Sequence, residues 1–369
     1  MLACRSSEFV YRNPKPHLRS RQAYHPTLLR RPDGELLCSF DLCDAVESLD
    51  YRTHLSRSSD EGRNWQFQGQ LPTDEAQCAL PVSLRLCQMR DGSIVGFGGR
   101  WRRDNPEEGQ VNRETQGMAP MELILLKSAD GGRRWGKPKV IAPPLVGPGF
   151  EICHRIVELP GGRWLAPTGT WRGWNGEHPS GDMAIVLISD DQGKSWLRFG
   201  VSFDGRKTGT IHFEQSVAPL PDGRLLAVSW AYDPLTGRTL PTPYCFSADK
   251  GETFGAPRPT GFLGQTCKLL PLADGRLLCV YRRDDSPGLW GTLSHLEGDD
   301  WIIDESALLW GKGLSNSGMD GTSSVADGLS DLKFGYPSLL QLPSGEVLVA
   351  FWCFENWSTN IRLLRLDIR

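Results

Sequence analysis

Short apolar runs alternate with polar turns along the whole chain, and one unit of this pattern recurs. In residues 25–40 (HPTLLRRPDGELLCSF) and 214–230 (EQSVAPLPDGRLLAVSW), an apolar run leads into a Pro/Asp/Gly turn and a second apolar run follows. Apolar runs that flank an Asp-Gly or Gly-Gly dipeptide predict a β-hairpin, because these residues tolerate the positive φ of type I′ turns. Six such hairpins follow from the sequence, with turn glycines at positions 34, 92, 162, 223, 275 and 345.

The spacing of these hairpins predicts the architecture. Successive turn glycines are separated by 58, 70, 61, 52 and 70 residues, and each interval holds about four strands with their loops, which is one blade of a β-propeller. We therefore expect an all-β chain that forms one domain over residues 1–369, a six-bladed propeller with four-stranded antiparallel blades. Residues 361–368 and 9–11 are expected to supply the last two strands of blade 6, so that the N- and C-terminal strands close the ring. The polar stretch 99–120 is expected to be an insertion loop.

A second motif, S-x-D-x-G-x-x-[WF], occurs four times in phase with the hairpins, at residues 58–65, 128–135, 189–196 and 247–254. The Asp carboxylate of such a turn accepts main-chain N–H groups of the same turn, and the Gly supplies an unusual backbone angle. The aromatic residue is suited to packing between sheets. The motif therefore indicates a structural turn and not a catalytic one.

Charge and composition exclude several classes of function. The net charge of -3 and pI near 6.2 provide no basic field for a nucleic acid partner. No apolar run is long enough for a signal-peptide core or a membrane span, so we expect a cytoplasmic protein without a membrane partner, or a secreted or periplasmic one if a leader was removed. The ten cysteines form no CxxC pair and are expected to be free thiols. The seven dispersed histidines predict no metal site, and no cofactor motif occurs.

The four turn motifs and six hairpins together resemble the Asp-box (BNR) repeat propellers of the sialidase, or neuraminidase, superfamily. The resemblance covers nearly the whole chain. Residues 293–304 in blade 5 keep an Asp and a Trp but not the box, and blade 6 has no box. The resemblance implies a site around the central axis, on the face opposite the Asp boxes.

Two rings of residues are expected to converge at this site, where the innermost strands begin and the second strands end. Nine residues before each turn glycine lie His25, Ser83, Cys153, Glu214, Thr266 and Tyr336. Seven residues after it lie Asp41, Gly99, Gly169, Trp230, Arg282 and Trp352.

The resemblance implies a catalytic pair within these rings. The family uses a tyrosine nucleophile assisted by a glutamate, and Tyr336 and Glu214 match those two residues. The pairing is chemically reasonable, because a phenol with a pKa near ~10 is a poor nucleophile until a carboxylate takes its proton. The alternative is that both residues line a solvated axial channel.

The chain departs from the family where arginines should clamp a substrate carboxylate. One expected arginine is replaced by Tyr24 and another by Trp230, and no arginine lies between Arg283 and Arg362. A bidentate contact to a sugar carboxylate is therefore missing. The missing arginines leave open a substrate other than ordinary sialic acid, or an altered mode of recognition.

Several residues compete for the role of acid/base. The family's aspartate lies in the loop that enters blade 2, where Asp74 and Glu75 are the candidates, while Asp41 and Asp44 compete from blade 1. His25 titrates near neutral pH and is a further candidate. The sequence leaves this choice open.

Aromatic and basic residues complete the expected site. Trp230 and Trp352 offer flat faces for a sugar ring, which favours a glycan as the partner. Arg282 lies in one ring, and deeper basic residues either attract an anion or form salt bridges along the channel; they are Arg85, Arg155 and Lys268.

These observations favour a sialidase-like exo-glycoside hydrolase that releases a terminal sugar, sialic acid or another, including an acidic one. Retention of the anomeric configuration would follow from a covalent tyrosyl intermediate. A polysaccharide lyase acting on uronates, with Tyr336 or His25 as the base, is the enzymatic alternative. A carbohydrate-binding propeller without catalysis is the third possibility, because one fold hosts unrelated functions.

Overall fold

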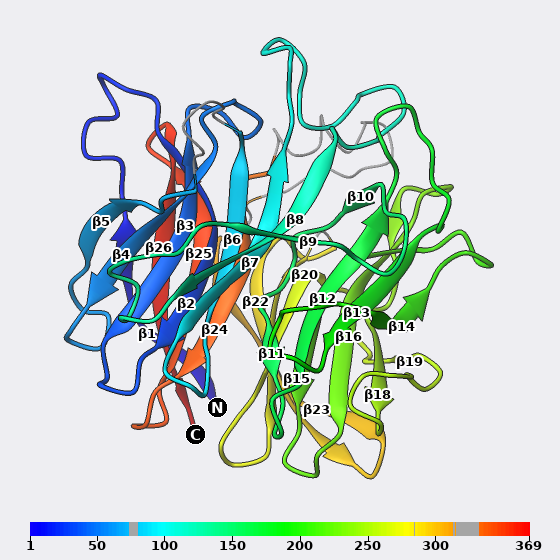
Figure 1. Ribbon diagram of the computed structural model, residues 1–369. Helices are drawn as coiled ribbons and strands as arrows, with labels where there is room; N and C mark the ends of the chain where they lie inside the picture. The colour runs from blue at the N-terminus through cyan, green and yellow to red at the C-terminus, as the bar shows by residue number, and fades with distance from the viewer. Residues whose placement is uncertain (74–79, 284, 313, 315–331) are drawn as a thin grey trace.

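Six antiparallel sheets surround a central axis as the blades of a β-propeller (Figure 1). The computed structural model describes residues 1–73, 80–283, 285–312, 314 and 332–369. This described part of the chain contains no helix, and so no helix that would cross a membrane. The all-β, six-bladed prediction is confirmed.

The strands follow one another blade by blade. Blades 1 and 2 contain β2 (Gln22–Arg30), β3 (Leu36–Cys43), β4 (Arg52–Ser58) and β5 (Gln66–Gln70), then β6 (Val82–Gln88), β7 (Ile94–Trp101), β8 (Met121–Ser128) and β9 (Lys139–Ile141). Blades 3 and 4 contain β10 (Gly149–Phe150), β11 (Val157–Glu158), β12 (Trp164–Trp171), β13 (Met183–Ser189) and β14 (Arg198–Asp204), then β15 (Ile211–Pro219), β16 (Leu225–Asp233), β17 (Arg238–Thr239), β18 (Pro243–Ser247) and β19 (Arg258–Pro259). Blades 5 and 6 contain β20 (Gln265–Pro271), β21 (Leu277–Arg283), β22 (Gly288–Glu297) and β23 (Asp300–Trp310), then β24 (Phe334–Gln341), β25 (Val347–Glu355), β26 (Ser358–Ile368) and β1 (Leu2–Tyr11).

The two ends of the chain close the ring. Strand β1 pairs with β26 from Leu2–Ile368 to Tyr11–Ile361, so blade 6 contains both termini, which lie side by side in Figure 1. The expected closure is thus confirmed, and it removes the open sheet edges at which the ring would otherwise end.

The turns that the sequence indicates are formed as expected. The six hairpin glycines have φ between 84 and 91°, a region that favours glycine. In the first Asp box, the Asn64 amide donates to Asp60 Oδ1 at 2.9 Å and the Gly62 amide to Ser58 Oγ at 2.8 Å. The other three boxes repeat this arrangement around Asp130, Asp191 and Asp249.

Two blades differ from the regular four-strand pattern. The innermost strand of blade 3 is interrupted between β10 and β11. In blade 4, the short strand β17 pairs antiparallel with the end of β16. The expected loop of residues 99–120 is shorter at its start, because β7 extends to Trp101. Residues 102–120 form the loop between β7 and β8, which rises above the ends of the sheets in Figure 1. Both the interruption and the loop shape the site described below.

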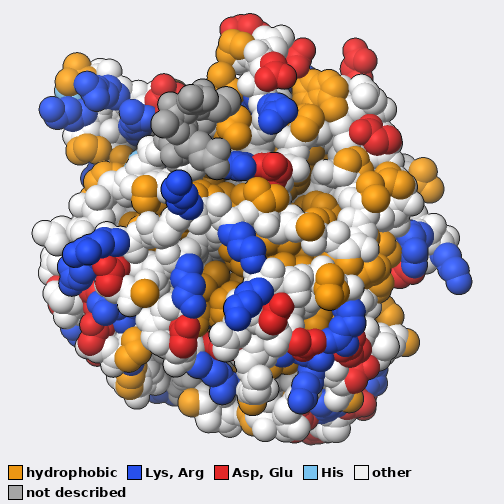
Figure 2. Space-filling model, in the orientation of Figure 1, with side chains coloured by type: hydrophobic (Ala, Val, Ile, Leu, Met, Phe, Trp, Pro, Cys, Tyr) orange, Lys and Arg blue, Asp and Glu red, His pale blue; other side chains and the backbone are white. Residues whose placement is uncertain are grey.

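Buried apolar side chains hold neighbouring blades together. Phe40 of blade 1, for example, packs in one cluster with Leu348 and Leu363 of blade 6. Nine described cysteines are free thiols. Acidic and basic side chains are interspersed on the face shown in Figure 2, so this face carries no continuous charge of one sign.

Candidate functional site

A cavity of about 240 Å³ opens on the axis where the innermost strands begin, at the end opposite the Asp boxes. Residues of both predicted rings line it, together with residues of the loops above. The predicted site residues in its wall are Tyr24, His25, Glu214, Trp230, Arg282, Tyr336 and Trp352. The structure therefore brings most of the predicted site residues together, although these residues come from four different blades.

Four residues of the first ring have an unusual backbone conformation. His25, Glu214, Thr266 and Tyr336 have φ between 48 and 51°. Each lies where the register of the innermost strand shifts, with two residues opposite one on the second strand. Such a bulge redirects a side chain, and a left-handed conformation at a non-glycine residue costs about 1–3 kcal/mol. The fold thus holds four strained residues around one cavity, which is typical of functional sites.

The strain at Thr266 predicts an inverted preference for glycine over alanine. Thr266→Gly is expected to be more stable than Thr266→Ala by about 1 kcal/mol, because only glycine is relaxed at positive φ. Urea unfolding of the two variants measures this difference.

Thr27, a buried residue two positions beyond His25, is the matched control. It does not have a positive φ, so Thr27→Ala should be more stable than Thr27→Gly by about 0.5–1 kcal/mol. An alanine preference at both positions would contradict the strain at Thr266.

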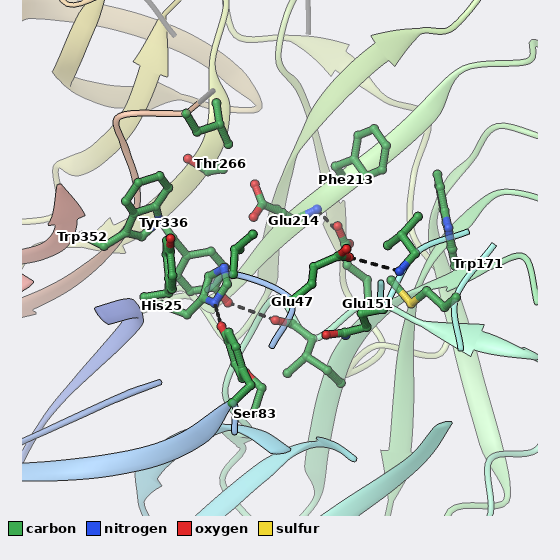
Figure 3. A pocket seen from close by; sticks show the side chains of 18 of the residues that line it. His25, Glu47, Ser83, Glu151, Trp171, Phe213, Glu214, Thr266, Tyr336 and Trp352 are labelled. Carbon is green, nitrogen blue, oxygen red and sulfur yellow. Dashed lines mark hydrogen bonds between the residues drawn. The ribbon is translucent and has the colours of Figure 1, made fainter. Parts of the chain in front are cut away.

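Two glutamates from neighbouring blades meet in the cavity wall (Figure 3). The main-chain amide of Glu214 donates to Glu151 Oε2 at 2.8 Å. Residues 151–156 lie opposite residues 166–169 in blade 3, six against four, and this interruption places Glu151 beside β15. Gly169 leaves space for the carboxyl group, because a Cβ there would lie 3.2 Å from Glu151 Oε2.

The two carboxyl groups have different environments. Burial, and secondly the charge of Glu214, raise the pKa of Glu151 to about 8, so Glu151 holds a proton at neutral pH. The carboxylate of Glu214 points into the cavity (Figure 3). Its buried Oε2 has no hydrogen-bond partner among the described residues. Glu151 is therefore a proton donor at neutral pH, and Glu214 presents an oxygen atom that no group in the described part of the chain binds.

The Tyr336 hydroxyl forms hydrogen bonds with groups other than Glu214. Its hydroxyl donates to the Cys153 carbonyl at 2.5 Å and accepts from Arg85 Nε at 2.9 Å. The described atoms of Tyr336 and Glu214 share no hydrogen bond. Burial raises the pKa of Tyr336, and the nearby charges of Arg85 and Lys268 oppose this rise without cancelling it. The phenol is therefore neutral at pH 7 and directed toward the axis below the cavity.

Asp41 lies behind the cavity wall. It is fully buried and accepts hydrogen bonds from Ser83 at 2.6 Å and Thr53 at 2.7 Å. Burial favours its neutral form, yet the charge of Arg85 and the proximity of His25 lower the pKa of Asp41. Its ion pair with Arg85, at 3.2 Å, makes it a support for that arginine.

His25 faces the cavity as a neutral side chain. Its Nδ1 lies 2.6 Å from the Tyr51 hydroxyl, and its ring contacts the Tyr336 ring edge-on, with centroids 4.9 Å apart. Burial lowers the pKa of His25. The imidazole is therefore available as a base or a hydrogen-bonding group, not as a cation.

The remaining predicted residues are distributed as follows. Arg282 Nε donates to Gln265 at 3.2 Å, so the guanidinium group is engaged with the protein. Arg155 lies outside this cavity, in a second one farther along the axis. Asp74 lies outside the described residues. Tyr24 packs against Trp352 with ring centroids 5.2 Å apart.

The sequence did not single out Glu151, Glu47 or Tyr51. Glu151 is two residues before the ring position Cys153, and the regular offset fails there because the strand is interrupted. Glu47 comes from the β3–β4 loop, accepts a hydrogen bond from the Val111 amide at 3.0 Å, and has its pKa raised by burial. The only sequence signal that could have indicated Glu151 was that a carboxyl residue lies close to a ring position.

The loop of residues 102–120 covers one side of the cavity. Trp171 Nε1 donates to the Gln116 carbonyl at 2.7 Å, and the Met118 amide donates to the Arg172 carbonyl at 3.0 Å. Large aromatic side chains form much of the wall; they are Trp101, Phe150, Trp171, Phe213, Trp230 and Trp352. Within the described ranges, no group of three or more potential metal ligands converges.

Comparisons with known proteins agree with this architecture. A model of the BNR repeat-like domain family matches residues 109–349. Among solved structures, a protein of unknown function from Dyadobacter fermentans is similar over 100% of this chain and 99% of its own, with 20% identity and a TM-score of 0.78. A search of curated proteins gives no match.

Two similar structures are glycoside hydrolases by name. A Hadza microbial sialidase is similar over 98% of this chain and 68% of its own, with 17% identity and a TM-score of 0.69. The Penicillium chrysogenum α-L-arabinanase, solved with arabinobiose, is similar over 99% and 98%, with 13% identity and a TM-score of 0.67. At these identities the likeness establishes the propeller fold.

Proposed function

The chain belongs to the BNR repeat-like domain family, and we propose that it is an exo-acting glycoside hydrolase that removes an uncharged terminal sugar from a glycan. One observation carries the proposal. A protonated Glu151 and a Glu214 whose buried oxygen has no hydrogen-bond partner within the described ranges share the wall of an aromatic cavity. Two carboxyl groups with different protonation are what glycoside hydrolysis requires.

In the proposed reaction, a Glu214 oxygen attacks the anomeric carbon while the glycosidic C–O bond breaks. Glu151 gives its proton to the leaving oxygen, and then takes a proton from the water that displaces Glu214. We therefore expect retention of the anomeric configuration.

The charges of the cavity favour an uncharged sugar. Three carboxyl residues line it, Glu47, Glu151 and Glu214. The two arginines in its wall are engaged with the protein, Arg85 with Asp41 and Arg282 with Gln265. A sialic acid or a uronate would bring its carboxylate among these groups without a free guanidinium fork. The arabinobiose in the similar arabinanase structure is a saccharide of the expected kind.

The size of the cavity favours removal of one terminal unit. Its volume of about 240 Å³ is below the roughly 300 Å³ at which pockets for larger ligands begin. The loop of residues 102–120 covers one side, which favours the end of a glycan over its middle.

A panel of nitrophenyl glycosides tests the proposal against its rivals. Release of nitrophenol from neutral glycosides, but not from sialosides, is expected. A new C=C absorbance with uronate polymers would identify a lyase instead. Turnover of sialosides alone would support the sialidase-type assignment, and sugar binding without any turnover would support a non-catalytic propeller.

Tyr336→Phe separates the proposed pair from a tyrosine nucleophile. Because its hydroxyl is bound to Cys153 and Arg85, its removal is expected to lower kcat/KM by at most about 10²-fold. It should also cost about 1–3 kcal/mol in urea unfolding, since Arg85 loses a buried acceptor. Complete loss of turnover in a folded variant would favour Tyr336 as the nucleophile.

A further inference from the structure

A second cavity lies on the axis below the first, with Tyr336 in the walls of both. Its volume is about 60 Å³, and residues of the innermost strands line it. The proposed hydrolytic reaction makes no use of this space.

The charged side chains around this second cavity are all basic. Arg85, Arg155 and Lys268 line it, and none of the described residues in its wall is acidic. Arg85 is neutralised by Asp41 at 3.2 Å. No carboxylate in the described part of the chain forms an ion pair with Arg155 or Lys268. Glu214 acts electrostatically on Lys268, so among the described residues the charge left without a counter-charge is that of the partly buried Arg155. Burial removes part of its hydration, which is costly unless it is compensated.

Lys268 and Arg155 differ in how well their donors are used. Lys268 Nζ donates to the Cys153 carbonyl at 2.7 Å and to the Glu214 carbonyl at 3.4 Å, and it lies 4.4 Å from the centre of the Tyr336 ring. The structure gives the Arg155 side chain one hydrogen bond, from Nη1 to the Leu28 carbonyl at 3.1 Å. A guanidinium group has five N–H donors. Most donors of Arg155 therefore remain for a ligand in the cavity that it lines.

We propose that this second cavity binds a small monovalent inorganic anion of the size of chloride, held by Arg155 and Lys268. The cavity exceeds the ~30 Å³ that one water molecule occupies in the liquid, so a halide ion fits within it. Larger organic anions do not fit into about 60 Å³. The anion supplies the counter-charge that the wall lacks, and the proposal does not depend on the hydrolytic activity.

Thermal unfolding at constant ionic strength tests this site. Sodium gluconate is replaced stepwise by sodium chloride, because gluconate is too large for the cavity. The wild-type Tm is expected to rise by about 3 °C and to saturate, as for a ligand that binds only the folded state. In Arg155→Met this rise should be absent, and in Arg155→Lys, which keeps the charge, it should be retained in part.

Arg90→Met is the matched control, since Arg90 is an exposed arginine beside the β6–β7 turn. It should show the wild-type rise. A wild-type Tm that does not respond to chloride would overturn the proposal, and so would an equal rise in Arg155→Met, which would indicate a general salt effect.

Anomalous diffraction from wild-type crystals grown in sodium bromide provides a test that needs no variant. A bromide peak between Arg155 and Lys268 is expected. Water density alone at that position, with bromide present throughout the crystal, would overturn the site even if Arg155→Met failed to fold.

Discussion

Replacing Glu214 by glutamine is expected to lower kcat/KM on a responsive nitrophenyl glycoside by about 10⁴-fold or more. Glutamine has nearly the same shape and preserves the main-chain bond from residue 214 to Glu151, but its amide cannot form the covalent glycosyl ester. The loss should therefore occur without unfolding. Steady-state kinetics and a thermal melt of the same preparation measure the two effects separately.

Glu158→Gln is the matched control for this variant. Glu158 belongs to β11 at the other end of blade 3, where it accepts a hydrogen bond from the Arg90 amide at 2.7 Å. Its replacement should leave kcat/KM within about twofold, as for surface changes away from a site. Comparable rates for Glu214→Gln and Glu158→Gln would exclude Glu214 from the chemistry.

Replacing Glu151 by glutamine is expected to have an effect that depends on the leaving group. With a sugar or another poor leaving group, kcat/KM should fall by about 10²–10⁴-fold, because the departing oxygen is no longer protonated. With dinitrophenol, which departs without a proton, the loss in the first step should be small. A loss of the same size for both leaving groups would contradict the assignment of Glu151 as the acid.

The pH dependence provides a second measure of Glu151. Its pKa of about 8 predicts that kcat/KM of the wild type falls tenfold per pH unit above pH 8, and that this decrease is absent in Glu151→Gln.

The raised pKa of Glu151 also means that the folded state binds the proton more tightly than the unfolded state. Its contribution to stability is full below the ordinary value of 4.5 and is lost as the pH rises to 8. Glu151→Gln should therefore gain roughly 4 kcal/mol relative to the wild type between pH 4.5 and 8.

The repeat made the fold predictable from the sequence. Asp-Gly turns and Asp boxes are local devices, and their glycines and carboxylates adopt the expected conformations because each turn needs only its own residues. Ring closure was predictable as well, since strands 9–11 and 361–368 had no other partner. Regular strand offsets also placed His25, Glu214 and Tyr336 in one cavity.

The site chemistry was less predictable because it depends on irregular backbone. The offset rule assumes continuous strands, and it selected Cys153 where the interruption of blade 3 places Glu151 instead. The rule also could not indicate that the Tyr336 hydroxyl is bound to Cys153 and Arg85. Loop residues such as Glu47 reach the cavity through contacts with Val111 that no local pattern encodes.

Trapping the covalent intermediate tests the division of roles between Glu214 and Glu151 most directly. A 2-deoxy-2-fluoro glycosyl fluoride of the sugar selected by the glycoside panel should inactivate the enzyme, because the fluorine slows release of the glycosyl group from its ester. Peptide mass spectrometry is expected to find the added mass on Glu214. The same mass on Tyr336, or turnover with inversion and no labelled peptide, would contradict the account.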